Sequence, residues 1–151
     1  MKGSIKNNGK ILFSGAVGVD GRFEKTDNLK LMLKVKALLE AQGHSCVCAR
    51  TEDTYVDLHT RPEQANAANC DYYIALHRNS AGEDANGIEA WVVHNALDKT
   101  VAQARGILDE IIAVTGFKNR GVKKGYTGNP NADYAVNRIS RMPSVLIEIG
   151  F

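Results

Sequence analysis

The stretch CDYYIALHRNS, from Cys70 to Ser80, decides the predicted fold and contains the first candidate for a functional site. Tyr72 to Leu76 is a short aromatic, branched and apolar run between polar neighbours, which predicts a buried strand of an α/β sheet. His77 follows at the carboxyl end of that strand, the edge where ligands gather in open α/β sheets. A histidine at this position is equally compatible with a strand cap that hydrogen-bonds to the backbone.

Strands and helices are predicted to alternate on both sides of this stretch. Further strands are expected at 11–13, 45–49, 88–93 and 144–149. Helices are expected from a cap at Thr26 or Asp27 to about Gly43, within 58–68 and at 96–115, most clearly where apolar residues recur at helical spacing. The basic run 118–124 is interpreted as a solvated loop, and 135–140 as a short strand or turn. This alternation predicts a single α/β domain with a mostly parallel, twisted sheet flanked by helices on both faces.

Composition narrows the classes of protein and partner. A chain of 151 residues suits one domain with a sizeable core. The net charge of +2 is too mild to indicate nucleic-acid binding, although it would not hinder approach to an anionic polymer such as a bacterial wall. No run of the sequence is long and apolar enough to predict a membrane span.

The cysteines and the first ten residues bear on the compartment. Cys46, Cys48 and Cys70 have neither metal-ligand spacing nor a disulfide framework, which favours reduced, mostly buried thiols. The first ten residues, MKGSIKNNGK, lack the apolar segment of a signal peptide. We therefore expect synthesis in the cytoplasm.

Glu148 is the least ordinary residue of the sequence, because it lies within the apolar run VLIEIGF. A carboxylate inside a buried strand must be paired, coordinated or protonated, since burial of an unpaired charge costs on the order of several kcal/mol. Such a site can raise the pKa of a glutamate towards neutrality, so that it can serve as a general base. The alternative is an outward-facing residue on an edge strand.

Glu24 is the third candidate, near the start of the first predicted helix. The simpler interpretation is a solvated charge that the helix dipole favours. Taken with His77 and Glu148, however, Glu24 suggests a metal-assisted hydrolase. Zinc accepts histidine nitrogen and glutamate oxygen, and it activates water and polarises carbonyl groups near neutral pH.

Several segments, in order along nearly the whole chain, resemble one enzyme family. The segments are SGAVG at 14–18, GRFEKTDNL at 21–29, Arg50-Thr51 with Arg61 and Ala65-Asn66, ALHRNS at 75–80, GIE at 87–89, RGVK at 120–123 and MPSVLIEIGF at 142–151. Together they resemble the zinc-dependent N-acetylmuramoyl-L-alanine amidases of the amidase-3 type. Similar catalytic domains occur in phage endolysins and in bacterial cell-wall hydrolases such as autolysins.

The resemblance implies an α/β fold and hydrolysis of the amide between N-acetylmuramic acid and L-alanine in peptidoglycan. It further implies that Glu24 and His77 are ligands of Zn²⁺ and that Glu148 is the catalytic base. From position and charge, Arg78, Asn79 and the basic run 118–124 are candidates for substrate contacts. With no signal peptide expected, an enzyme of this kind would reach the cell wall after lysis.

The sequence departs from the family pattern in the loop after the first strand. The family carries its first zinc ligand there, in a Gly-His-Gly-Gly loop, whereas here Phe13 is followed directly by Ser14-Gly15-Ala16. His59 and His94 are poor replacements by position. We interpret residues 1–151 as an amidase-3-like catalytic domain shortened at this loop and at the C-terminus.

These departures leave alternatives open. An inactive or weakly active peptidoglycan-binding relative that has lost a complete zinc site is the second hypothesis for the function. A hydrolase with another nucleophile is disfavoured, because the sequence has no G-x-S-x-G elbow. We expect a monomer, although an apolar face exposed by a shortened C-terminus would favour self-association.

Overall fold

A computed structural model describes residues 10–15, 24–79, 86–126 and 128–150, except for the side chains of 10–15, 24, 25 and 130. Within these ranges the strands are β1 (Lys10–Gly15), β2 (Ser45–Cys48), β3 (Tyr72–His77), β4 (Ile88–Val92), β5 (Asn119–Lys124) and β6 (Ser144–Glu148). The helices are α1 (Glu24–Ala41), α2 (Thr60–Ala67), α3 (Asp98–Thr115) and α4 (Ala135–Ile139), with a 3-10 turn η1 at Pro130–Ala132.

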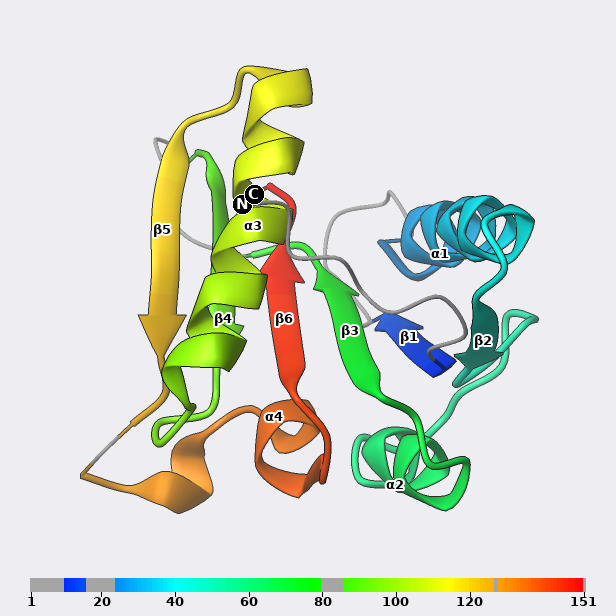
Figure 1. Cartoon of the computed structure of the whole chain (residues 1–151). Helices are drawn as coiled ribbons and strands as arrows, with labels where there is room; N and C mark the ends of the chain where they lie inside the picture. Colours follow the sequence, from blue (N-terminus) through cyan, green and yellow to red (C-terminus); the bar gives the residue numbers. More distant parts are fainter. Residues whose placement is uncertain (1–9, 16–23, 80–85, 127, 151) are drawn as a thin grey trace.

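The six strands form one sheet in the order β2-β1-β3-β6-β4-β5 (Figure 1). Four of the five neighbouring pairs are parallel, and only the pair of β4 and β6 is antiparallel. The prediction of an α/β domain with a mostly parallel sheet is therefore confirmed. Because β1, β2, β3 and β6 run in one direction, their last residues share one edge of the sheet, here called the carboxyl edge.

Two apolar clusters cover the two faces of the sheet. On one face, Met32 of α1 and Leu108 of α3 pack with Tyr72, Ile74 and Leu76 of β3. On the other face, Ala65 of α2 and Val136 of α4 pack with alternate residues of the central strands, Tyr73, Ala75 and Leu146. Helices therefore flank both faces, as predicted. The face of α2 and α4 is called the site face below.

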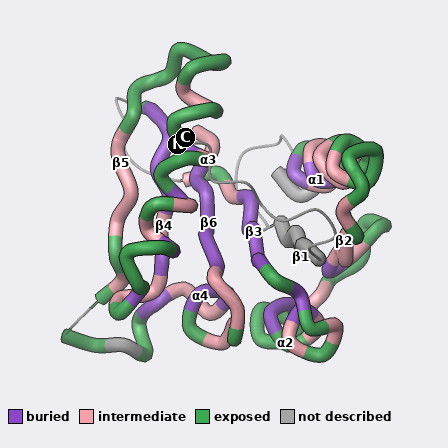
Figure 2. Tube along the Cα trace, viewed as in Figure 1, coloured by how far each residue is buried: buried purple, intermediate pink, exposed green. Residues whose placement is uncertain are grey.

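The central strands β3 and β6 are buried along nearly their whole length (Figure 2). Strands with an apolar layer on each side need apolar residues at consecutive positions, which explains why YYIAL and VLI do not alternate with polar residues. Because β6 lies between β3 and β4, the alternative of Glu148 on an exposed edge strand is excluded.

Two local predictions are wrong. The run 118–124 is not a loop, because Asn119–Lys124 forms the edge strand β5, which pairs with β4. Residues 135–140 are neither strand nor turn, because Ala135–Ile139 forms the short helix α4. The remaining predicted elements are present, with ends that differ by a few residues. Among the described residues, no helix combines the length and the apolar character needed to cross a membrane.

Candidate active site

The candidate site forms where three neighbouring strands place polar residues in line at the carboxyl edge. His77 ends β3 and pairs with Glu148, which ends β6, and Glu148 in turn pairs with Glu89 on β4. Because side chains alternate along a strand, all three lie on the face of Tyr73 and Leu146, which is the site face. Neighbouring strands lie about 4.8 Å apart, so the backbones of His77, Glu148 and Glu89 follow one another at about this spacing across the sheet.

The backbone holds this register beyond the ends of the strands. The Ile149 amide donates to the His77 carbonyl at 2.9 Å, and the Asn79 amide donates to the Gly150 carbonyl at 2.8 Å. These two bonds tie the segments that follow β3 and β6. His77 and Glu148 therefore end neighbouring strands whose backbones are hydrogen-bonded to each other. Their relative position does not depend on a flexible loop.

Burial keeps the His77 imidazole neutral. Loss of solvent, reinforced by the positive charge of Arg61, lowers its pKa to about 4. The Arg61 side chain is itself buried at the start of α2, where Nε donates to the Val56 carbonyl at 2.9 Å. A neutral imidazole is the form that binds a metal, and this one keeps that form through mildly acidic pH.

The first turns of α1 meet the end of β3. Asn28 is buried, and its Nδ2 donates to the carbonyl of Leu76, the residue before His77, at 3.3 Å. Glu24 is the first residue of the same helix, one turn before Asn28. The Glu24 side chain lies outside the described residues, so its role as a zinc ligand stays a prediction.

Glu148 is buried, with 4% of its surface exposed. Burial, and then the charges of Glu148, Tyr126 and Glu89, raise the pKa of Tyr134 to about 12, so this tyrosine lies within electrostatic reach of both glutamates. The Tyr134 ring packs edge-on against Trp91 at 5.7 Å between centroids. Glu148 therefore occupies a largely dehydrated position next to His77 in register, and its role as the general base stays a prediction.

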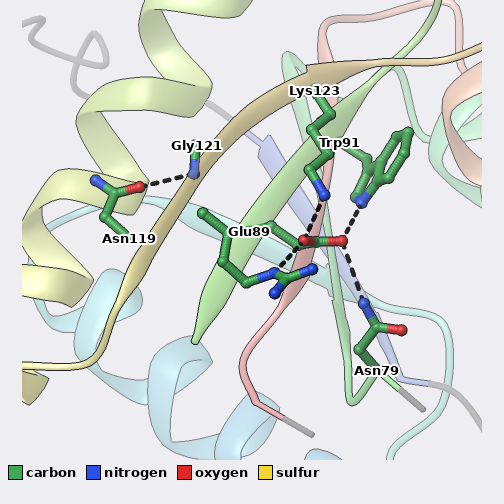
Figure 3. A network of polar contacts seen from close by, with 7 residues as sticks. Asn79, Glu89, Trp91, Asn119, Gly121 and Lys123 are labelled. Atoms are coloured by element: carbon green, nitrogen blue, oxygen red, sulfur yellow. Dashed lines mark hydrogen bonds and ion pairs between the residues drawn. The ribbon is translucent and has the colours of Figure 1, made fainter. Parts of the chain in front are cut away.

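Glu89 accepts four side-chain hydrogen bonds at this edge (Figure 3). Its Oε1 accepts from Asn79 Nδ2 at 3.1 Å and from Trp91 Nε1 at 2.8 Å. Its Oε2 accepts from Arg120 Nε at 2.6 Å and from Lys123 Nζ at 2.7 Å. Burial would raise the pKa of Glu89, but these donors outweigh it and lower the pKa. The five residues are called the Glu89 cluster below.

A bulge in β5 makes the Glu89 cluster possible. Residues three apart, such as Arg120 and Lys123, point to opposite faces of a regular strand. Here β4 advances by two residues, from Ile88 to Ala90, while β5 advances by three, from Asn119 to Val122. Gly121 has a φ of 85° in this bulge, and its amide donates to Asn119 Oδ1 at 2.8 Å. The extra residue brings both cations to the site face.

The remaining predicted residues divide into two groups. Arg78 is exposed beside His77, and Asn79 is half-buried in the Glu89 cluster. Contact of either residue with the substrate stays a prediction. His94 donates its backbone amide to Asp133 Oδ2 at 2.8 Å, and its Nδ1 lies 2.9 Å from the same oxygen. The His59 side chain is 61% exposed beside Asp57. His94 follows the end of β4, which runs antiparallel to β6, so it lies at the edge opposite to His77 and Glu148.

The described residues fit part of a zinc site. His77 supplies a neutral imidazole, and Glu24, the first residue of α1, is the carboxylate ligand that the family resemblance implies. Within the described side chains there is no group of three or more histidine, cysteine, aspartate or glutamate residues that could hold a metal ion. Of the two predicted zinc ligands, only His77 has a described side chain, and the role of Glu24 stays a prediction.

Comparison with known proteins gives the family. The family model for N-acetylmuramoyl-L-alanine amidase (Amidase_3) matches residues 7–151. The chain belongs to the amidase-3 family. This confirms the resemblance, and the family is one of hydrolases that act on the cell wall. Members of the amidase-3 family are typically zinc-dependent.

Individual relatives agree with this assignment. A sporulation-specific N-acetylmuramoyl-L-alanine amidase of Bacillus subtilis is 34% identical over 139 residues, 91% of this chain and 51% of that protein. An endolysin of Bacillus phage SPP1 is 34% identical over 141 residues, 89% of this chain and 49% of that protein. This amidase-3 chain therefore spans about half the length of these two relatives.

Two solved structures agree as well. The N-acetylmuramoyl-L-alanine amidase of Clostridium difficile 630 superposes with a TM-score of 0.85 and 28% identity, over 96% of this chain and 81% of that one. The AmiC2 amidase of Nostoc punctiforme gives a TM-score of 0.80 at 31% identity, over 94% and 79%. The sheet that carries His77 and Glu148 is thus an amidase-3 fold.

Sequence reasoning missed the importance of Glu89 and of its two cations. Alternation along 88–93 placed Glu89 on the face of Trp91, which was the available signal. Its partners are 31 and 34 residues later in a run interpreted as a loop. Arg61 was noticed only as part of a motif, and its proximity to His77 depends on how α2 packs.

Proposed function

We propose that this chain hydrolyses the amide bond between the lactyl group of N-acetylmuramic acid and L-alanine in peptidoglycan. Membership of the amidase-3 family supports the reaction class. The observation that carries the proposal is the register of His77 with Glu148: a neutral imidazole and a buried carboxylate end adjacent parallel strands on one face.

Glu24 and His77 are the residues proposed to hold zinc, which when bound supplies Lewis-acid polarisation of the scissile carbonyl. His77 is suited to this role because burial and Arg61 disfavour its protonated form. The hydrogen bond from Asn28 to the Leu76 carbonyl fixes the start of α1 against β3, which supports a contribution from Glu24.

Glu148 is proposed as the general base. Its carboxylate takes a proton from the attacking water as the water oxygen bonds to the lactyl carbonyl carbon. It then gives a proton to the alanine nitrogen as the carbon–nitrogen bond breaks, which releases a lactyl carboxylate and a free amino group on L-alanine. Position on a central strand between β3 and β4 keeps the Glu148 backbone fixed through both transfers.

Arg78 and Asn79 are proposed to contribute to substrate binding. The Arg78 side chain is exposed directly after His77, so it can reach a bound glycopeptide. We expect Arg78→Ala to raise KM with little change in kcat, whereas Arg105→Ala, at an exposed position of α3 on the opposite face, should change neither. Unchanged KM and wall binding in Arg78→Ala would remove Arg78 from the site.

Digestion of purified peptidoglycan in the presence of zinc tests the proposed reaction. An amidase releases new amino termini on L-alanine without new reducing sugar ends. Glu148→Gln should reduce the rate by about 10²–10⁴-fold, the usual contribution of a general base. Glu63→Gln, at an exposed position of α2, is the matched control and should retain the wild-type rate. Wall binding without release of amino termini would instead support a non-catalytic binding module.

A further inference from the structure

The Glu89 cluster holds more positive charge than Glu89 can neutralise. One buried carboxylate, 2% exposed, binds both the Arg120 guanidinium and the Lys123 ammonium group. The formal sum for these three groups is +1. The Arg120 and Lys123 side chains are 29% and 35% exposed, so the excess positive charge is accessible to solvent although the Glu89 carboxylate is buried.

The cluster also fixes these cations in position. Lys123 Nζ lies 5.2 Å from the centre of the Trp91 ring, in addition to its ion pair with Glu89. The Trp91 ring in turn stacks on Tyr126 and packs edge-on against Tyr134. An ammonium group held in this way has already lost much of the side-chain freedom that binding a ligand would otherwise restrict.

The location relates this charge to the candidate active site. Lys123 pairs with Trp91 in register, on the same face as Glu89, Glu148 and His77. Both cations reach over to Glu89 on β4, the strand next to β6, so their charges lie between one and two strand spacings from Glu148, about 5–10 Å. An extended peptide advances at most about 3.3–3.6 Å per residue, so two residues cover about 7 Å.

We propose that Arg120 and Lys123, presented by Glu89, form a subsite for the free carboxylate of the second residue of the peptide stem. The inference rests on the proposed function, because it assumes that the scissile amide lies at His77 and Glu148. Charge and reach together select a carboxylate rather than a neutral amide at this position. The consequence is that amidation of this carboxylate in a cell wall would protect the wall from this chain.

Two synthetic N-acetylmuramoyl peptides test the subsite, identical except that the second residue carries either a free carboxylate or a primary amide. The wild-type chain should cleave the carboxylate form with about tenfold higher kcat/KM, mainly through KM. Lys123→Gln should lose this preference, because its kcat/KM for the carboxylate form falls towards that for the amide form. Lys124→Gln is the matched control, because Lys124 pairs with Val92, whose side chain belongs to the opposite face, and donates to the Ala96 carbonyl.

Equal kcat/KM for the two peptides in the wild-type chain, or an undiminished preference in Lys123→Gln, would overturn the subsite. Cleavage of neither peptide would count against the proposed function instead. In that case calorimetric binding of the same two peptides decides the subsite. Tighter binding of the carboxylate form that is lost in Lys123→Gln would support it, and equal binding would refute it.

Discussion

Two ionisable groups, the half-buried His77 on β3 and the buried Glu89 on β4, lie on the same face of one sheet, and the charges around them have opposite effects. Glu89 receives four side-chain donors that stabilise its charge. His77 lies near Arg61, a charge of the same sign as its protonated form, and burial lowers its pKa to about 4. The sheet therefore holds a neutral imidazole, which can bind a metal, at the end of β3, and a charged carboxylate on β4.

The difference has a functional meaning. A metal competes with protons for an imidazole, so a histidine that resists protonation suits metal binding. A carboxylate saturated by cations is poorly suited to proton transfer and better suited to holding those cations in place. Glu148 lies between the two residues in register, which fits its proposed role as the base. The following predictions test this contrast, from the largest expected effect to the smallest.

The strongest test of the His77 side of the contrast is the pH dependence of stability in the zinc-free chain. In the unfolded chain the imidazole binds a proton below about pH 6.5, whereas in the folded chain it does so only near pH 4. The free energy of unfolding should therefore fall as the pH is lowered from about 6.5 to 4, by about 3 kcal/mol from this group. His77→Gln should lose this part of the dependence, as measured by urea denaturation at a series of pH values. A variant with the same pH profile as the wild type would contradict the contrast.

The Glu89 side of the contrast is tested by Glu89→Gln. The substitution leaves two cations without their shared carboxylate, and we expect a loss of about 1–3 kcal/mol, less than for a fully buried pair because both cations are partly exposed. Urea midpoints measure the loss, with the exposed Glu63→Gln as a control that should leave the midpoint unchanged. Equal midpoints for the two variants would mean that the cluster contributes little to stability.

The bulge that aligns Arg120 with Lys123 predicts a smaller effect. Gly121 has a φ of 85°, so Gly121→Ala should destabilise the chain by about 1 kcal/mol although the added methyl group meets open space. Gly106→Ala, in the interior of α3 and also in open space, should instead stabilise by about 0.5–1 kcal/mol. Thermal unfolding of both variants gives the comparison, and a shift of the same sign in both would contradict the role assigned to the bulge.

Most of the sheet could be predicted because buried strands require runs of apolar residues, which are visible in the sequence. The apolar runs of β3 and β6 indicate strands covered on both faces, and they place His77 and Glu148 at strand ends. Strand β5 could not be recognised, because NRGVKK has a single apolar residue, Val122, and a bulge that disturbs its alternation. Helix α4 has five residues, too few for a helical period to appear.

The candidate site was predictable only in part, for a physical reason. A residue at a strand end is visible in the sequence, but its partners depend on strand order and direction. Glu89 lies opposite Glu148 because β4 pairs with β6 in the antiparallel direction. No local sequence pattern indicates the direction in which β4 runs. The predicted roles of Glu24, Arg78 and Asn79, and the predicted shortening of the loop after β1, stay predictions.

Zinc content tests the central claim most directly, namely that the carboxyl edge of β3 and β6 is a metal-assisted active site. The purified chain would be saturated with zinc, freed of excess metal and measured by elemental analysis beside His77→Ala and the control His59→Ala, whose histidine is 61% exposed. We predict about one zinc per chain in the wild type and in His59→Ala, and loss of that zinc in His77→Ala. Absence of zinc from all three proteins, or equal zinc in His77→Ala and the wild type, would contradict the claim.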